Sequence, residues 1–371
     1  MNKKSPLLRV LARAETMPEE LTETPLQRSL SRAERTRPME QKHRTLVTSI
    51  LERVAKQMKI KIHIEPVWGY VGQIVLRDGR TRYFRNTNLD INSLGSSEVA
   101  RDKNYADYFL KRMGYPIIPG RAFFTRRWNK VLEADNGPDK AFAYAKSIGF
   151  PVIVKPNSKS QGLGVTKAYN RTDLMAAVRR IEKIDRVYLV QRVMTGHDYR
   201  IVVIDQEVIS AYERLPLAIT GNGRSTVQEL LLAKQRLFVK TGRDTEINLR
   251  DPRITRELRR MGFSRRSVLP KGQAVTLLPN ANLSTGGDAI DVTEVIHPKW
   301  KTLARNIARD MNLRYIGIDI MSTETLDKPP GDYVVIEINA APGLDNYSAM
   351  GPRQKRIVEG LYRKALEALI K

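Results

Sequence analysis

Two apolar segments late in the chain carry oxygen-bearing side chains where buried strands normally carry none. In residues 315–321 and 333–339, alternation places isoleucines and valines on one face and Asp319, Glu337 and Asn339 on the other. An unpaired buried carboxylate is costly, and oxygen ligands without His or Cys suit a hard cation such as Mg²⁺. A single such acid could equally be an edge-strand residue that faces solvent. Three together favour a magnesium site that holds phosphates.

A glycine-rich segment, residues 157–164, lies between two expected strands and follows Lys155. Small residues let backbone amides approach phosphate oxygens, and the lysine adds a point charge at the strand end. The segment matches neither the P-loop pattern nor GxGxxG before a helix, so alone it would indicate only a turn. A further segment, residues 188–200, is an apolar strand that runs into a polar turn with Asp198 and Arg200. Beside the three metal-ligand candidates, these segments predict a phosphate-binding site.

Alternating strands and helices must position these side chains, and the pattern predicts an α/β chain with α+β lobes. Residues 1–44 are polar, Arg-rich and interrupted by prolines, which favours a basic extension that is mobile or loosely docked. We expect a small N-terminal lobe at 45–100 and a main domain at 101–371 with a basic insertion at about 215–275. Helices are predicted at 45–59, 97–113, 140–148, 173–184, 227–238, 254–261, 298–311 and 352–370. Strands are predicted at 61–64, 72–77, 81–85, 151–155, 165–168, 187–190, 200–204, 207–213, 274–278, 315–321 and 333–339.

The order of these features resembles the ATP-grasp superfamily over roughly residues 97–360. Lys103 opens a helix, Lys155 precedes a flexible Gly-rich loop, a hinge strand is followed seven residues after Gln191 by Asp198, and the site ends in Asp…Glu-x-Asn. The phrases that tie the chain to the ATP-grasp part of cyanophycin synthetase are Asp198-Tyr-Arg200, GNGRST at 221–226, LPKG at 269–272, NLSTGG at 282–287 with DVT at 291–293, and EINAAPG at 337–343. The resemblance implies two lobes that grip ATP, behind a smaller N-terminal lobe.

The resemblance also implies a role for each matching residue. Lys103 and Lys155 would contact the ATP phosphates, and the segment with Ser160, Gly162 and Gly164 would close over them as a lid. Backbone groups of Gln191, Arg192 and Val193 would hold adenine, and Asp198 would take the ribose hydroxyls. Arg200 would face the phosphates or an acyl phosphate, and the loop with Asn282 and Ser284 would shape the acceptor side. Asp319, Glu337 and Asn339 would ligate two Mg²⁺ ions, with Mn²⁺ as an alternative. Many relatives have Glu where Gln191 stands.

Composition narrows the classes of function. The 371 residues carry 64 Lys and Arg against 40 Asp and Glu, a formal net charge of +24, which concentrates anions. No apolar run reaches the roughly 18 residues of a membrane span, and no apolar stretch follows the basic start as in a secretion signal. The absence of cysteine excludes disulfides and thiolate chemistry and fits a cytoplasmic location. The four histidines are widely spaced, so a zinc site is not expected.

Residues 234–271 hold 12 basic and 4 acidic residues, a local charge of +8. Arg250, Arg253, Arg256, Arg259 and Arg260 include neighbours at helical spacing that would repel one another without an anion nearby. One hypothesis is that this block binds an acidic substrate, so that charge reversal at Arg256 and Arg259 should raise KM for that substrate alone. The other is a solvated face of a generally basic protein.

The resemblance implies an ATP- and Mg-dependent carboxylate–amine ligase that forms a peptide or amide bond through an acyl phosphate. Cyanophycin synthetase continues into a second lobe and has a larger N-terminal domain, so we expect a single-step ligase of the same type. Its expected partners are a small-molecule or acidic-peptide substrate, without membrane contact, and by analogy a homo-oligomer is one option. The alternative is a non-catalytic nucleotide or polyanion binder that uses the +24 charge. No RNA-binding, helix-turn-helix or zinc-finger motif supports specific nucleic-acid recognition.

Overall fold

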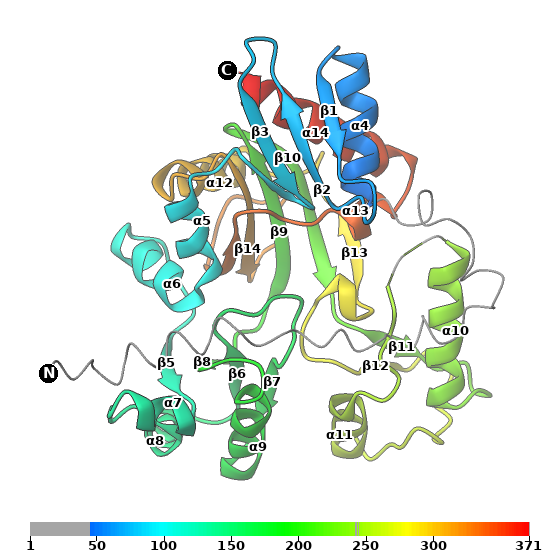
Figure 1. Ribbon diagram of the computed structural model, residues 1–371. Coiled ribbons are helices and arrows are strands. Elements are labelled where there is room, and N and C mark those ends of the chain that lie inside the picture. Colours follow the sequence, from blue (N-terminus) through cyan, green and yellow to red (C-terminus); the bar gives the residue numbers. More distant parts are fainter. Residues whose placement is uncertain (1–44, 242, 244, 371) are drawn as a thin grey trace, which may run out of the picture. The chain divides into compact units, whose positions relative to one another are not determined.

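The computed structural model describes residues 45–241, 243 and 245–370. Two compact units divide the chain, and residues 44–65 and 69–371 form the unit that carries every element named below (Figure 1). The other unit comprises residues 1–43 and 66–68. The predicted extension at 1–44 therefore lies outside the described residues. The domain boundaries at 45, 101, 215 and 275 stay predictions.

The N-terminal part is a four-stranded antiparallel sheet covered by one helix. The helix is α4 (Leu46–Gln57), and the sheet runs β1 (Lys61–Ile64), β2 (Val71–Val75), β3 (Thr81–Arg85) and β4 (Asn88–Leu89). The helical spacing of apolar residues along α4 buries Val47, Leu51 and Val54 against the sheet and against the last helix of the chain. This confirms the predicted helix and strands.

The single helix expected at 97–113 is wrong, because the chain forms two helices there. These are α5 (Leu94–Arg101) and α6 (Lys103–Arg112), and Asp102 between them has extended backbone angles. The Asp102 carboxylate caps α6 by accepting from the Tyr105 amide (2.9 Å) and also accepts from the Asn157 side chain (2.6 Å). The break places Lys103 in the first turn of α6.

The first lobe of the main domain is an antiparallel sheet with helices against it. The strand order is β5 (Gly120–Phe124), β8 (Val187–Arg192), β6 (Val152–Pro156) and β7 (Thr166–Ala168). Helices α8 (Pro138–Ile148) and α9 (Arg171–Ile181) share a core with this sheet, and α7 (Arg126–Val131) follows β5. Strand β5 and helix α7 were not predicted from the sequence, because these short segments lack a clear hydrophobic period. Strand β6 ends at the Gly-rich loop, and β8 leads to the next lobe.

The second lobe is a five-stranded antiparallel sheet with helices on both faces. Its order is β13 (Asp288–Asp291), β10 (Glu207–Leu215), β9 (His197–Ile204), β14 (Tyr315–Ser322) and β15 (Tyr333–Asn339). Alternate residues of β9 pack on opposite sides, Ile201 and Val203 with α12 (Pro298–Asp310) and Val202 and Ile204 with α14 (Pro352–Ile370). The short α13 (Asp345–Ser348) precedes α14. The central strands are therefore apolar on both faces, which makes each charged side chain on them conspicuous.

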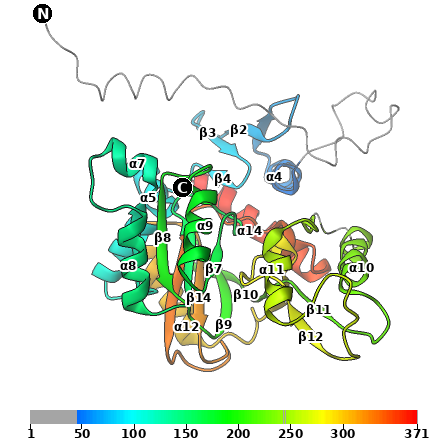
Figure 2. The same cartoon turned by 90° about the horizontal axis from the view of Figure 1, so that it is seen from below.

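The predicted insertion has its own small core. It consists of β11 (Ala218–Thr220), α10 (Val227–Lys240), α11 (Pro252–Arg260) and β12 (Ala274–Thr276), and β11 pairs with β12. A capping box at Thr226 and Glu229 starts α10. Figure 2 shows α11 next to β7 and α9 of the first lobe. Within the described residues, no helix is both long and apolar enough to cross a membrane.

Candidate active site

A cavity of about 890 Å³ lies where the two lobes and the insertion meet. Every site residue proposed from the sequence lines it except Gly164, which packs against Pro156 and Ile184. The cavity also takes in residues that the sequence reading did not single out, among them Thr87, Arg214, Asn280, Asn346 and Tyr347. At about 890 Å³ it lies within the range of ligand-binding cavities.

The three candidate metal ligands meet as their alternation predicts. Asp319 of β14 lies directly opposite Glu337 of β15, and Asn339 lies opposite Gly317. Hydrogen bonding orients the Asn339 amide with its nitrogen 3.2 Å from Glu337 Oε1 and its oxygen 3.2 Å from Arg200 Nη2. Asp319 is buried, whereas the Glu337 side chain keeps 22% of its surface exposed. The pair therefore opens to the cavity on the Glu337 side.

Two arginines hold Asp319. Arg200 donates from Nε and Nη2 to its two oxygens (2.7 and 2.8 Å), and Arg214 donates from Nη1 to Oδ2 (2.8 Å). These cations keep the pKa of Asp319 below its usual range despite burial, which raises it. Asp319 is therefore a carboxylate at neutral pH. Arg214 was missed because the predicted strand stopped at Glu213, one residue before it.

This donor set fits a magnesium ion that enters with a nucleotide. The two carboxylate oxygens of Asp319 offer about four lone-pair positions, and the arginines use three, so one oxygen can still accept a ligand bond. Glu337 lies 3.6 Å from Lys103, and the Asn339 amide nitrogen lies 3.2 Å from its Oε1 atom. Carboxylate and amide oxygens are hard ligands. Among the described residues, no group of three or more His, Cys, Asp or Glu gathers as a metal centre, so the third ligand of such a site would be the amide of Asn339.

Both predicted lysines are buried beside these acids. Lys103 donates to the carbonyl oxygens of Lys159 (2.6 Å) and Asn157 (3.4 Å) and lies 3.6 Å from Glu337. Burial lowers the pKa of Lys155, and Glu337 and Asp107 oppose that change. Asp107 of α6, which the sequence reading missed, accepts from Gln191 Nε2 (3.3 Å). Burial raises its pKa to about 6, although Lys155 and Lys103 lower it.

Asp198, the residue expected at the ribose, lines the cavity in an ion pair with Arg214. Arg214 Nε and Nη2 both donate to Asp198 Oδ1, at 2.9 and 2.5 Å. Burial is the largest influence on this carboxyl and raises its pKa to about 6, while Arg214 opposes the rise. One arginine therefore joins the ribose candidate Asp198 to the metal candidate Asp319. The role of Asp198 toward a ribose stays a prediction.

The Gly-rich loop lies against the predicted acceptor loop. Gln161, Gly162 and Gly164 all have positive φ angles, between 56° and 74°. A Cβ on Gly162 would lie 2.4 Å from Asn282 Nδ2 and 2.6 Å from Asn280 Nδ2, so these side chains would have to shift, and the φ of 69° itself favours glycine. The lid and acceptor segments, more than 100 residues apart in sequence, thus form adjacent walls of one cavity.

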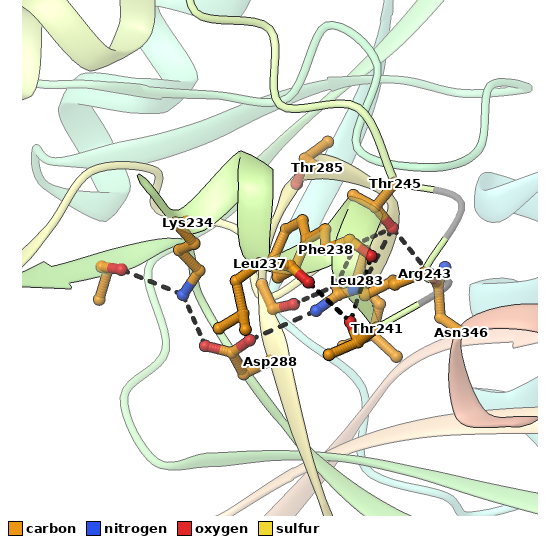
Figure 3. A network of polar contacts seen from close by, with 12 residues as sticks. Lys234, Leu237, Phe238, Thr241, Arg243, Thr245, Leu283, Thr285, Asp288 and Asn346 are labelled. Atoms are coloured by element: carbon orange, nitrogen blue, oxygen red, sulfur yellow. Dashed lines mark hydrogen bonds and ion pairs between the residues drawn. The ribbon is translucent and has the colours of Figure 1, made fainter. Parts of the chain in front are cut away.

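A polar network from the insertion fixes the acceptor loop (Figure 3). Arg243 donates to the carbonyl oxygens of Leu283 (2.6 Å) and Gly287 and to Asp288 (3.3 Å), and it stacks over the Phe238 ring. Thr245 donates to Asn346 Oδ1 (2.8 Å), which lines the cavity. Part of the positive charge of the insertion therefore supports the site internally.

The five arginines of the basic block divide into two groups. Arg253 pairs with Asp251 (2.6 Å), Arg260 lies 4.0 Å from Glu257 with its guanidinium over the Tyr169 ring, and Arg256 is half-buried. Arg250 and Arg259 are exposed, and Arg260 is exposed as well despite its contacts with Glu257 and Tyr169. Internal partners thus account for some of the block, and the hypothesis of an acidic substrate concerns the exposed arginines.

Comparison with family models places two regions of the chain. Residues 109–220 match the C-terminus of D-ala D-ala ligase, and residues 280–353 match the RimK-like ATP-grasp domain. Between them, the two matches include the hinge strand, Asp198, Arg200, the acceptor loop and all three candidate metal ligands. The insertion lies mainly in the gap between the two matches.

Curated relatives are ligase proteins. The chain is 32% identical over 283 residues to cyanophycin synthetase from a Nostoc species, with 74% of this chain and 30% of the relative covered. It is 31% identical over 258 residues to the glutathione biosynthesis bifunctional protein GshAB of Streptococcus mutans, with 66% and 32% covered. The chain thus spans about three tenths of the length of these relatives. These matches do not favour a non-catalytic binder.

A solved structure shares the fold. The bifunctional glutathione synthetase from Pasteurella multocida matches with a TM-score of 0.54 at 24% identity, covering 86% of this chain and 43% of that one. The two-lobed arrangement expected from the sequence is therefore confirmed at the level of the fold.

Proposed function

The chain belongs to the ATP-grasp superfamily, and on that premise we propose that it is an ATP- and Mg-dependent ligase that joins a carboxylate to an amine. The observation that carries the proposal is the meeting of Lys103, Lys155 and the Asp319–Glu337 pair in one cavity with the Asn282 loop. A protein that only binds nucleotide would need the lysines, but it would not need the Asn282 loop as a second wall of the cavity for an acceptor substrate.

The proposed reaction has two steps. A substrate carboxylate oxygen attacks the γ-phosphorus of ATP, and the bond from that phosphorus to the β,γ-bridging oxygen breaks. ADP is released, and the substrate becomes an acyl phosphate. The amine then attacks the acyl carbon, phosphate leaves, and the amine loses a proton as the amide forms. In this scheme Lys103 and Lys155 hold the phosphates, and Arg200, fixed by Asp319, faces the transferred phosphoryl group.

Magnesium would be held by Asp319, Glu337 and Asn339, and when bound it supplies charge neutralisation at the phosphates. We propose two ions, with Mn²⁺ as a substitute. The Ser160–Gly164 lid, the adenine contacts at Gln191–Val193 and the ribose contact at Asp198 complete the proposed nucleotide site. The lid keeps water from the acyl phosphate, which water would otherwise hydrolyse.

We propose an acidic amino acid or acidic peptide as the carboxylate substrate. Support comes from the net charge of +24 and from the exposed Arg250, Arg259 and Arg260 of the insertion. A phosphate-release screen with Mg-ATP tests the proposal with single amino acids, pairs of them, and poly-Asp or poly-Glu, followed by mass spectrometry. Substrate-dependent release with a condensed amide product supports a ligase. Release that no substrate stimulates, together with steeply salt-dependent polyanion binding, would favour a binder instead.

A further inference from the structure

We propose that Arg253 of the insertion is a positioning residue that holds the Gly-rich lid closed, so that the insertion controls how well ATP consumption is coupled to amide formation. The inference rests on the proposed function, because it assigns a task to the lid of that site. Arg253 joins the insertion to residues 162–165, which lie in the region that matches the C-terminus of D-ala D-ala ligase.

Arg253 bridges α11 and the lid. Its Nη1 atom donates to the carbonyl oxygens of Gly162 (3.2 Å) and Val165 (3.0 Å). On its other side, Nε and Nη2 donate to the Asp251 carboxylate, with a shortest distance of 2.6 Å. The two side chains are only 14% and 10% exposed. Asp251 thus fixes the guanidinium plane, and the remaining nitrogen is aimed at the lid.

Besides Arg253, Lys103 holds the start of the lid through the Lys159 carbonyl oxygen (2.6 Å), and Thr166 Oγ1 donates to the Gly164 carbonyl oxygen (3.3 Å). The lid's own backbone bonds include Leu163 to Ser160 (3.1 Å) and Val165 to Gly162 (3.3 Å), and the Leu163 side chain is 54% exposed. Three of its residues adopt positive φ angles. Bonds from a charged donor are about twice as strong as neutral ones. The two hydrogen bonds that Arg253 donates to the lid should therefore be a main restraint on its closed position.

Like charges meet at the same contact. Burial lowers the pKa of Arg180 on α9, and the nearby Arg256 and Arg253 lower it further, while Asp251 opposes them. Repulsion between α9 and α11 would push the lid and insertion apart if Asp251 did not compensate. The closed lid therefore depends on the Asp251–Arg253 pair as a unit, and loss of either member should release it.

The first measurement is tryptic cleavage after Lys159, within the lid, with and without Mg²⁺ and a non-hydrolysable ATP analogue. We expect the analogue to protect the wild-type lid and Arg253→Met to lose at least about tenfold of that protection, the change that loss of about 1.4 kcal/mol produces. Arg253→Lys keeps the charge but lacks the fork, so it should resemble Arg253→Met. Asp251→Asn keeps a good helix cap and should also lose protection. Arg266→Met, which removes an exposed arginine of the same insertion, is the control.

The second measurement is the ratio of phosphate released to amide formed. It should stay near one in the wild type and in Arg266→Met and rise severalfold in Arg253→Met, because an open lid admits water to the acyl phosphate. Wild-type protection and coupling in Arg253→Met, or full rescue by Arg253→Lys, would overturn the proposal. If no substrate gives an amide, the ligase proposal fails, while the cleavage measurement still decides the role of Arg253.

Discussion

At the scale of single residues, the site is a balance of charges. Around the cavity, four cations meet four carboxylates: Lys103, Lys155, Arg200 and Arg214 with Asp107, Asp198, Asp319 and Glu337. Each buried charge has an opposite partner, which is the condition under which charges are tolerated away from water. A nucleotide and its metal would add anions and cations together. The site is thus built to accept them as a complex.

Glu337→Gln should lower the rate of turnover by at least about a hundredfold, the range for losing one preorganised electrostatic group. The substitution removes a negative charge beside Lys103 but keeps the shape of β15. Phosphate release under saturating ATP measures the rate, and thermal unfolding should show an unchanged fold. Glu324→Gln, an exposed acid paired with Lys328 between the same two strands, is the matched control. A near wild-type rate in Glu337→Gln would refute the metal assignment.

Asp107→Asn should stabilise the protein at pH 8 and have little effect below about pH 4. Burial raises the pKa of Asp107 to about 6 from the ordinary 3.8, so the folded state binds this proton more tightly than the unfolded state. The stability contributed by the carboxyl is therefore greatest at low pH and declines as pH rises from about 4 to about 6. We expect an increase in Tm of about 2–4 °C at pH 8. The exposed Asp332→Asn is the control, and an equal shift at both pH values would contradict the argument.

At the scale of elements, the sequence predicted the positions of the strands better than the side-chain contacts between elements. Alternation in β14 and β15 correctly placed Asp319 and Glu337 on the cavity side. It was wrong for Ile336, because a β-bulge turns Val335 into the core with Ile338 and leaves Ile336 in the cavity wall. The break at Asp102 was not predictable from helical period, since it depends on Asn157, 55 positions away. Arg214 and Asp107 were missed for the same reason: a single charged residue in a strand or helix gains meaning only from its partners in space.

Asn92, between β4 and α5, links this part of the chain to the strands that carry the candidate metal ligands. Its side chain donates to the carbonyl oxygens of Tyr315 (2.6 Å) and Ala340 (2.7 Å) and accepts from the Tyr315 amide (2.9 Å). It therefore ties the start of β14 to the turn after β15. Sequence patterns gave no sign of this residue, because a polar residue between two elements normally indicates a loop.

Asn92→Ala should destabilise the protein by about 1–3 kcal/mol, the cost of leaving buried backbone groups without partners. The turn that follows Asn339 should loosen, so the rate of turnover should fall as well. Urea unfolding and phosphate release measure the two effects. Asn88→Ala removes a single long contact to Arg85 (3.4 Å) in the N-terminal sheet and should change neither. Equal stability of the two variants would show that Asn92 is not a structural link.

At the scale of the whole molecule, the net charge of +24 has two possible interpretations. It provides either a docking surface for an acidic chain or a solvated basic exterior. The structure bears on this question, since Arg243 and Arg253 have internal partners, whereas Arg250, Arg259 and Arg260 are exposed. Attraction that depended only on net charge would act through the whole surface. Attraction by a docking surface would depend on where the charges lie, and variants of equal net charge separate these cases.

The double variant Arg250→Glu/Arg259→Glu lowers the net charge by four and should weaken binding of a fluorescent poly-Glu peptide by about tenfold at low salt. The loss should shrink as salt rises, because charges on an exposed surface are screened beyond about 8 Å at physiological ionic strength. Lys299→Glu/Lys301→Glu on α12 changes the net charge equally, outside the insertion. Fluorescence anisotropy across a salt series compares the two. A loss confined to the first variant supports docking on the insertion, whereas equal losses would mean that the net charge alone attracts the peptide.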